Sequence, residues 1–423
     1  MATQEHIAKI MQAQQAFFAS GATIDVDFRI KSLRKLQAVI KRREAEINAA
    51  IQADLGKSAF ESYMCEVGLT LSELSCQLKH VRKWAKPQRV ASDLANFPSM
   101  YRTVAEPYGE VLVMSPWNYP FLLTIEPLIG AVAAGNCCVV KPSAYSPATS
   151  DCMASIIAEV FDPAHVTYIL GGREENSILL EQRWDYIFFT GSPSVGKLVM
   201  SKASRFLTPI SLELGGKSPC VITRDCDLEL AATRLAFGKW LNVGQTCIAP
   251  DYVLCDESVH DEFVELFKAE VAKMYGKDAL VNPNYGKIVN RKHYERVRGL
   301  IDEDKVVYGG RSDDKALRIE PTIMVGVTDD DAVMGEEIFG PLCPILKVSG
   351  PKEAEDFIKA HEKPLALYLF SNDRALQERF MRHVPFGGGC INDTIVHIAT
   401  SKMGFGGVGN SGMGSYHGHK SFE

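Results

Sequence analysis

The chain has 423 residues, of which 46% are hydrophobic and 23% are charged, and its formal net charge is −6. This length predicts two or three folded domains, and the acidic balance excludes the basic footprint expected of a nucleic-acid-binding protein. The longest apolar stretch, residues 122–140, is interrupted by Glu126, Pro127 and Asn136, which excludes a membrane span.

The first ninety residues or so predict helices. Apolar residues recur at helical spacing over residues 29–56, and Gly56 is a typical residue for ending such a helix. A second helical block covers about Met64 to Trp84. The segment 93–109 fits neither this helical pattern nor the strands that follow it.

From Glu110 onward, short apolar strands alternate with helices. Parallel strands that are covered on both faces have this nearly continuous apolar character. We therefore predict a doubly wound parallel sheet, which binds its ligands at the carboxyl ends of the strands. The predicted strands are residues 110–116, 137–143, 165–170, 186–191 and 209–216.

A second alternating series predicts a second α/β domain. It starts with a strand at 218–222, continues with a helix at 228–241 and a strand at 252–257, and reaches a helix at 259–275. Further strand-like segments follow at 305–310, 365–371 and 390–397.

Two glycine motifs imitate nucleotide-binding loops. "GSPSVGKL" at 191–198 matches a P-loop until Leu198, where a hydroxyl is needed to hold magnesium, so phosphoryl transfer is rejected. The loop can still offer backbone N–H groups and a helix N-terminus to a phosphate. "GVGNSG" at 407–412 fits the dinucleotide fingerprint, but too few residues follow it for the helix and strand that the fingerprint requires.

Three residues carry candidate chemistry. Cys247 lies in the small and polar loop "NVGQTCIAP", where a thiol is either inert or presented to a reactant. Glu213 ends an apolar strand, where burial would raise its pKa and suit it to act as a base, although a solvent-facing edge position is an equal alternative. Asn118 follows the first strand, so its amide either stabilises an oxyanion or caps a helix. A thiol, a base and an amide donor together suit nucleophilic acyl chemistry.

The cysteines and the N-terminus indicate the compartment. Eleven cysteines without a CxxC pair fit a reducing environment better than a disulfide framework. The N-terminus has no apolar signal core, and the histidines and cysteines lack zinc spacing. We expect a cytoplasmic protein that uses no metal.

Seven motifs, in order, resemble the aldehyde dehydrogenase superfamily. They cover the chain from about residue 100 to its end, and "WNYPF" and "GGVGNSGMGSYHG" are most similar to the class 3 branch of fatty and aromatic aldehyde dehydrogenases. The motifs are "SPWNYPF", "GNCCVVKPS", "FFTGSPSVGK", "LELGGKSP", "GQTCIAPDY", "EEIFGP" and "GFGGVGNSGMG".

The resemblance implies a complete domain plan. It comprises a Rossmann-like dinucleotide-binding domain, a catalytic domain and a small β arm that bridges two subunits of a homodimer. The corresponding residues are 1–92 and 110–212 for the first domain, 213–394 for the second, and 93–109 with 395–423 for the bridging arm.

The resemblance also implies a mechanism and a cofactor. Cys247 would attack the aldehyde to form a thiohemiacetal, Asn118 would hold its oxyanion, and hydride would pass to NAD or NADP. Glu213 would then activate water to release the carboxylic acid from the thioester. The residues implied to contact the cofactor are Trp117, Lys141, Gly191, Ser192, Glu337 and Phe339.

Substrate and cofactor preference follow less directly. Tyr119 and Ile395 are candidates for an apolar substrate channel, with core packing as an equal alternative. Ala144 stands where many relatives carry an acidic residue beside the adenosine ribose, so we expect NADP to be used well. Two alternative functions remain: a CoA-acylating aldehyde dehydrogenase, which commonly lacks the counterpart of Glu213, and a non-catalytic relative.

Overall fold

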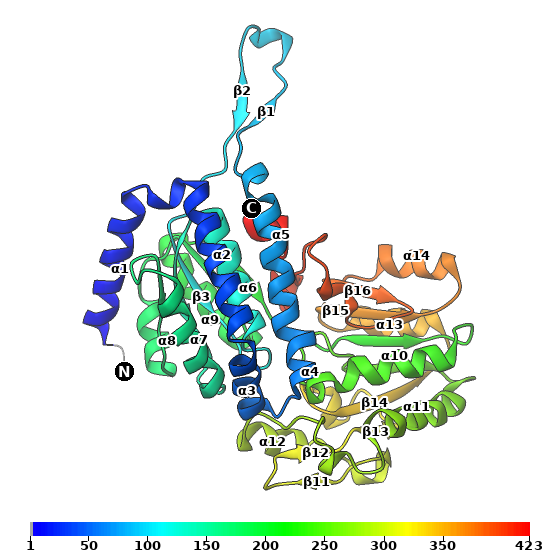
Figure 1. Ribbon diagram of the computed structural model, residues 1–423. Helices are drawn as coiled ribbons and strands as arrows, with labels where there is room; N and C mark the ends of the chain where they lie inside the picture. Colours follow the sequence, from blue (N-terminus) through cyan, green and yellow to red (C-terminus); the bar gives the residue numbers. More distant parts are fainter. Residues whose placement is uncertain (1–2) are drawn as a thin grey trace.

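The computed structural model describes residues 3–423 and contains two α/β units and a projecting arm (Figure 1). The first unit is built on a six-stranded sheet in the order β17-β7-β6-β3-β4-β5. Its strands are β3 (Glu110–Met114), β4 (Cys137–Lys141), β5 (Val166–Tyr168), β6 (Tyr186–Thr190), β7 (Ile210–Glu213) and β17 (Gly412–Met413). The five strands predicted from the sequence are all present and mutually parallel, which confirms the doubly wound fold.

Helices cover both faces of this sheet. Alternate strand residues enter two separate hydrophobic cores, as the two-residue period of a strand requires. One core is completed by α2 (Val26–Arg42), α3 (Glu44–Leu55), α5 (Gly68–Trp84), α6 (Leu122–Ala134) and α7 (Pro147–Val160). The other is completed by α1 (Gln4–Ala19), α8 (Arg173–Leu180) and α9 (Pro193–Ala203).

The N-terminal helices differ from the prediction in two places. The helix predicted over 29–56 is broken at Arg43, whose guanidinium bonds Glu46 and the Ser155 hydroxyl, although Gly56 is the left-handed C-cap as expected. The second helical block begins with α4 (Ala59–Ser62) and a π-helical turn, Tyr63–Val67, before α5. A Cβ on Gly68 would lie 2.8 Å from the Tyr63 carbonyl oxygen, so glycine is needed where this turn joins α5.

The second unit contains a seven-stranded sheet in the order β10-β13-β14-β9-β8-β15-β16. Only β10 runs antiparallel to its neighbour. The strands are β8 (Pro219–Ile222), β9 (Tyr252–Asp256), β10 (Val306–Tyr308), β13 (Thr322–Val325), β14 (Leu342–Val348), β15 (Ala366–Phe370) and β16 (Gly388–Ile391). Its helices are α10 (Leu228–Trp240) and α11 (His260–Tyr275) on one face, and α13 (Pro351–Ala360) and α14 (Arg374–His383) on the other. Between α11 and β13 the chain also forms α12 (Arg291–Arg298), β11 (Ser312–Asp313) and β12 (Arg318–Ile319), which lie outside this sheet.

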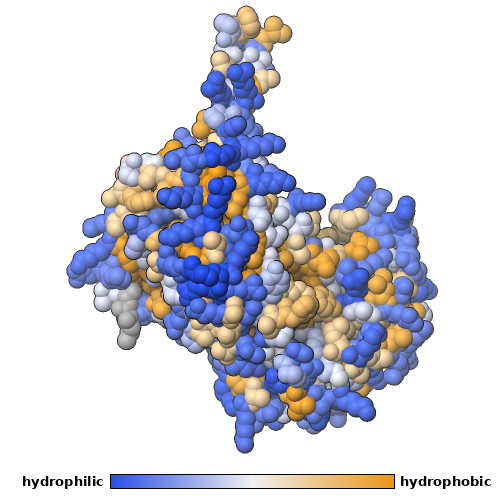
Figure 2. Space-filling model, viewed as in Figure 1, coloured by the Kyte–Doolittle hydropathy of each residue, from blue (hydrophilic) through white to orange (hydrophobic). Residues whose placement is uncertain are grey.

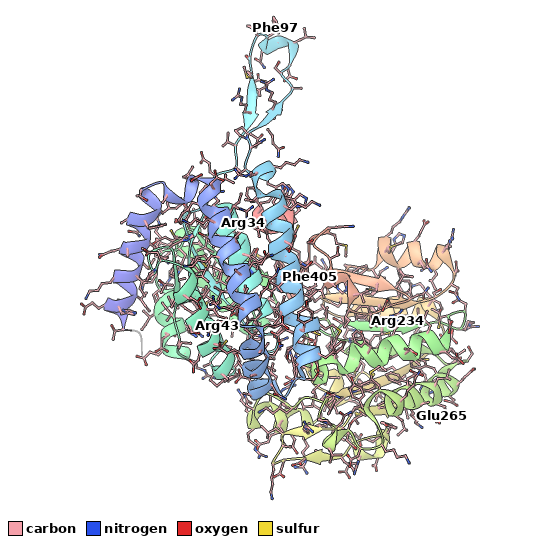
Figure 3. All side chains as sticks on the ribbon, in the orientation of Figure 1. Arg34, Arg43, Phe97, Arg234, Glu265 and Phe405 are labelled. Carbon is pink, nitrogen blue, oxygen red and sulfur yellow. The ribbon has the colours of Figure 1, made fainter. Side chains whose placement is uncertain are left out.

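The arm is a hairpin of β1 (Gln88–Val90) and β2 (Tyr101–Thr103) that extends away from both units (Figure 1). It begins before residue 93, the boundary expected from the sequence. Figure 3 shows Phe97 at its outer end, and Figure 2 shows apolar atoms exposed there. Leu94 and Phe97 are 97% and 80% exposed.

The C-terminal segment 395–423 lies elsewhere. β17 pairs with β7, and α15 (His419–Phe422) packs on α5 and α6, so this segment completes the first unit within its own chain and does not project with the hairpin. The bridging role of both segments stays a prediction. Among residues 3–423, no helix combines the length and apolar character that crossing a membrane requires.

Candidate active site

A cavity of about 560 Å³ lies at the carboxyl ends of the strands of the first sheet. This volume is in the range of small-molecule and cofactor sites. Asn118 follows β3, Gly191 follows β6 and Glu213 ends β7, and all three line the cavity. Cys247 and Glu337 line it from the second unit, so chain segments far apart in the sequence meet in one site.

The loop that carries Cys247 is held rigidly. Asn242 and Val243 have φ of 52° and 58°, a strained left-handed conformation for residues with side chains. The Gln245 side chain donates to the Lys287 carbonyl oxygen at 3.0 Å and accepts from the Val289 N–H at 3.0 Å, which ties the loop to the segment before α12. From Asn242 to Asp256, Cys247 is the one residue that is not buried. The fold therefore leaves Cys247 partly accessible from the cavity while it buries the neighbouring residues.

The surroundings of Cys247 favour the protonated thiol. Burial raises the pKa of the Cys247 thiol to about 12, and the nearby carboxylates of Glu337 and Glu213 add to the rise, while the backbone N–H groups of Cys247 and Ile248 oppose it. Because the thiolate is the nucleophile, the sulfur has to lose a proton before it can attack a carbonyl carbon.

Glu213 is a buried carboxyl group without a bonding partner. Its side chain is 3% exposed, and neither carboxyl oxygen has a hydrogen-bond partner among the described residues. Burial raises the pKa of Glu213 well above its ordinary value. The solvent-facing alternative for this residue is therefore wrong, and the group has the environment of a general base.

Asn118 is oriented by hydrogen bonds at both ends. Its side-chain Nδ2 donates to the backbone carbonyl oxygen of Gln245 at 3.0 Å. The backbone carbonyl oxygen of Asn118 accepts from Asn242 Nδ2 at 2.8 Å. A primary amide carries two N–H donors, so the bond to Gln245 leaves one available. The side chain does not cap α6, whose N-cap residue is Phe121, and the capping alternative is therefore wrong.

The cavity also offers the elements that a dinucleotide needs. Gly191, Ser192 and Pro193 line it at the N-terminus of α9, where the Ser192 side chain makes no capping bond, so the first N–H groups of the helix are free to bind a phosphate. Gly215 approaches Glu337 so closely that a Cβ would lie 2.0 Å from Glu337 Oε2, and burial raises the pKa of Glu337 to about 8. These features fit a ligand that carries both phosphates and ribose hydroxyls.

Aromatic side chains form one wall. The rings of Trp117 and Phe339 meet edge to face with centroids 5.3 Å apart, and Phe339 has a left-handed φ of 48°. His293 also packs against Trp117, with ring centroids 5.0 Å apart, and both His293 and Arg296 line the cavity. Neither His293 nor Arg296 was a candidate from the sequence. Asn290, a helix N-cap preceding "RKHYERVR", was the signal that could have revealed α12.

Three sequence candidates lie outside the described lining of this cavity. Lys141 is buried, and its Nζ donates to the carbonyl oxygens of Pro142 and Gly171, at 2.7 and 2.8 Å. Tyr119 is buried, and its hydroxyl forms a hydrogen bond with Thr246 Oγ1 at 2.6 Å. Ile395 is buried in the hydrophobic core that also contains residues of α2, α5 and α6. Their cofactor and channel roles stay predictions. No group of residues suited to hold a metal ion occurs within residues 3–423.

Comparison with known proteins gives consistent matches. The family model "Aldehyde dehydrogenase family" matches residues 1–423. The rat protein "Aldehyde dehydrogenase, dimeric NADP-preferring" is 46% identical over 414 residues, which are 98% of this chain and 91% of that protein. The Bos taurus protein "Aldehyde dehydrogenase family 3 member B1" is 43% identical over 416 residues, 98% of this chain and 89% of that protein. The solved "Substrate bound state of Staphylococcus Aureus AldH" has a TM-score of 0.97 at 44% identity, covering 98% of this chain and 91% of that one.

Proposed function

This chain belongs to the aldehyde dehydrogenase family and oxidises aldehydes with NAD or NADP, and from that premise we propose that Cys247, Asn118 and Glu213 perform the chemistry. The observation that carries the proposal is that a nucleophile, an amide donor and a general base line one cavity although each comes from a different segment. No one of these residues alone would favour this assignment over ordinary packing.

The first half of the reaction forms a covalent intermediate on Cys247. The thiol loses its proton to solvent, and its sulfur bonds the aldehyde carbon. The carbonyl oxygen becomes an oxyanion that accepts hydrogen bonds from Asn118 Nδ2 and from the Cys247 backbone N–H. NAD or NADP, when bound, would supply the hydride acceptor; loss of hydride from the carbon of the thiohemiacetal leaves a thioester on Cys247.

The second half releases the acid. Glu213 takes a proton from a water molecule, whose oxygen bonds the thioester carbon, and the carbon–sulfur bond then breaks. The carboxylic acid leaves and the Cys247 sulfur is free again. Neither carboxyl oxygen of Glu213 has a hydrogen-bond partner within the described residues, so the group breaks no existing bond when it takes the proton from water.

The cofactor would be held by three parts of the cavity wall. The α9 N-terminus with Gly191 and Ser192 would bind the pyrophosphate. Glu337 would accept from ribose hydroxyls, and Phe339 with Trp117 would pack against the nicotinamide. We assign aliphatic and aromatic aldehydes as the substrate class, because apolar side chains such as Leu123 and Met334 line the same cavity.

The proposal extends to assembly and compartment. A homodimer would cover the exposed apolar tip of the arm, where Leu94 and Phe97 are solvated in the monomer. A reducing, cytoplasmic setting suits eleven cysteines that are all free thiols. Light scattering of wild type and of a Leu94→Ser/Phe97→Ser variant tests the dimer, and an unchanged mass would contradict this role of the arm.

Absorbance of reduced dinucleotide tests the chemistry. Hexanal is the substrate, NAD and NADP are used in parallel, and Cys247→Ser is the control. We expect turnover without CoA that is lost in the variant. Turnover that begins only when CoA is added would favour the acylating reaction and remove the role given to Glu213, whereas no turnover over a wider aldehyde panel would contradict the assignment of this substrate class.

A further inference from the structure

A fully buried ion pair contacts the segment that carries Asn118. Lys57 Nζ donates to Glu66 Oε1 at 2.7 Å, and both side chains are 0% exposed. An ion pair removed from water contributes little net stability, because the desolvation of both charges offsets their attraction. The contacts that this pair makes with neighbouring residues therefore explain its presence better than a contribution to stability does.

The pair holds the short connection between β3 and α6 in its middle and at its C-terminal end. Lys57 Nζ also donates to the Asn118 carbonyl oxygen at 3.0 Å and lies 4.0 Å from the centre of the Tyr119 ring. Glu66 Oε2 accepts from the backbone N–H groups of Phe121 and Leu122 at 2.8 and 3.3 Å. These are N–H groups at the start of a helix whose own N-cap residue makes no side-chain bond. Residues 118–122 are thus fixed by one salt bridge.

The same helical region reaches the nucleophile loop. Glu61 in α4 accepts from the Asn242 N–H at 2.7 Å, and Asn242 is one of the left-handed residues that precede Cys247. Asn242 Nδ2 bonds the carbonyl oxygens of Asn118 and Gln245, at 2.8 and 3.1 Å. Glu66 itself lies in the π-helical turn Tyr63–Val67, and such turns occur frequently at functional sites.

We propose that Lys57 and Glu66 are positioning residues for the reaction: the buried pair keeps the free N–H of the Asn118 amide directed at the oxyanion. Neither residue lies in the described lining of the cavity, so the pair acts through Asn118. The inference rests on the oxyanion role proposed above for Asn118. A shift of about 1 Å in such a donor is enough to cost about a hundredfold in rate.

A double-mutant cycle tests this inference. Lys57→Met/Glu66→Gln removes both charges together, which avoids leaving one buried charge unpaired. We expect kcat for hexanal to fall about 10²-fold in the wild-type background and less than about threefold when Asn118 is already alanine. The KM for hexanal should change much less than kcat. Equal losses in the two backgrounds would show a merely structural role and overturn the inference.

Further variants keep the result interpretable. Lys57→Arg retains the charge and should recover most of the lost kcat. Lys35→Met is a control for loss of a lysine-to-backbone bond away from the cavity, because the exposed Lys35 donates from Nζ to the Val160 carbonyl oxygen at 2.9 Å. The kcat of this variant should equal that of wild type. If Lys57→Met/Glu66→Gln does not fold, Glu66→Asp enters the cycle, because it keeps both charges but shortens the side chain that holds the Phe121 and Leu122 N–H groups.

Hydrogen–deuterium exchange supplies a readout without turnover. Amides of residues 118–124 should exchange about tenfold faster in Lys57→Met/Glu66→Gln than in wild type, because the pair no longer holds this connection. Unchanged exchange would overturn the inference. Absence of turnover in wild type would instead contradict the proposed substrate class, so the two failures are distinguishable.

Discussion

Replacing Glu213 by glutamine is expected to separate the two halves of the reaction. Glutamine has nearly the same shape but cannot take a proton from water. The acylation half needs Cys247 and Asn118, whereas hydrolysis of the thioester needs the base. A rapid burst of about one reduced cofactor per active site should therefore precede a very slow steady state.

The magnitude follows from the surroundings of this carboxyl group. Positioned general bases contribute about 10²–10⁴-fold, and within the described chain no other carboxylate at the cavity combines burial with two unpartnered oxygens. We expect kcat to fall about 10³-fold, with the burst amplitude preserved. Stopped-flow absorbance measures both quantities in one trace.

Stability should change in the opposite direction from activity. Because the folded-state pKa of Glu213 is raised by burial, the folded protein holds a proton that the unfolded chain has lost above about pH 4.3. Stability contributed by this site therefore falls as pH rises. Glutamine cannot ionise, so the stability of Glu213→Gln relative to wild type should rise from pH 4 to pH 8, by about 1.4 kcal/mol for each pH unit over which only the folded wild type keeps this proton.

Glu110→Gln is the matched control for this prediction. Glu110 is also buried, with a pKa that burial raises to about 7, but it lies at the amino end of β3, the opposite edge of the sheet. The kcat of Glu110→Gln should equal that of wild type. The reasoning is refuted if Glu213→Gln loses the burst as well as the steady state, because the carboxylate would then be essential before the thioester forms.

Three other expectations are tested with the same assay. Asn118→Ala should lower kcat/KM about 10²–10³-fold, as for the loss of one oxyanion donor, with the alkylation rate of Cys247 unchanged; an effect below threefold would contradict the role. In wild type, kcat/KM should rise continuously from pH 6 to pH 9, because the pKa of the Cys247 thiol is raised to about 12 and the thiolate fraction grows with pH; a plateau below pH 7 would count against this. NADP should give kcat/KM within about tenfold of NAD, because Ala144 offers no carboxylate to repel a 2′-phosphate; a much larger preference for NAD would refute it.

The architecture of the first unit followed from local patterns. Its five parallel strands are continuous apolar runs, and their helices begin and end at recognisable residues such as Pro147, Pro193 and Gly135. β17 escaped prediction because two residues, Gly412 and Met413, carry no periodicity. Its pairing with β7 depends on a contact between segments about two hundred residues apart in the sequence.

For the site, motif order and residue chemistry were enough to identify Cys247, Glu213 and Asn118 as candidates, because a thiol, a carboxylate and an amide have distinct reactivities wherever they lie. Only the tertiary structure decided that the three line one cavity and that Glu213 is without a bonding partner. Lys57 and Glu66 show the same limit: in the sequence they are two ordinary charged residues near the ends of predicted helices, and their burial and their bonds to residues 118–122 appear only in the folded structure. Chemistry and periodicity are local properties that a sequence displays, whereas exposure, partnership and pKa depend on segments that meet only when the chain has closed on itself.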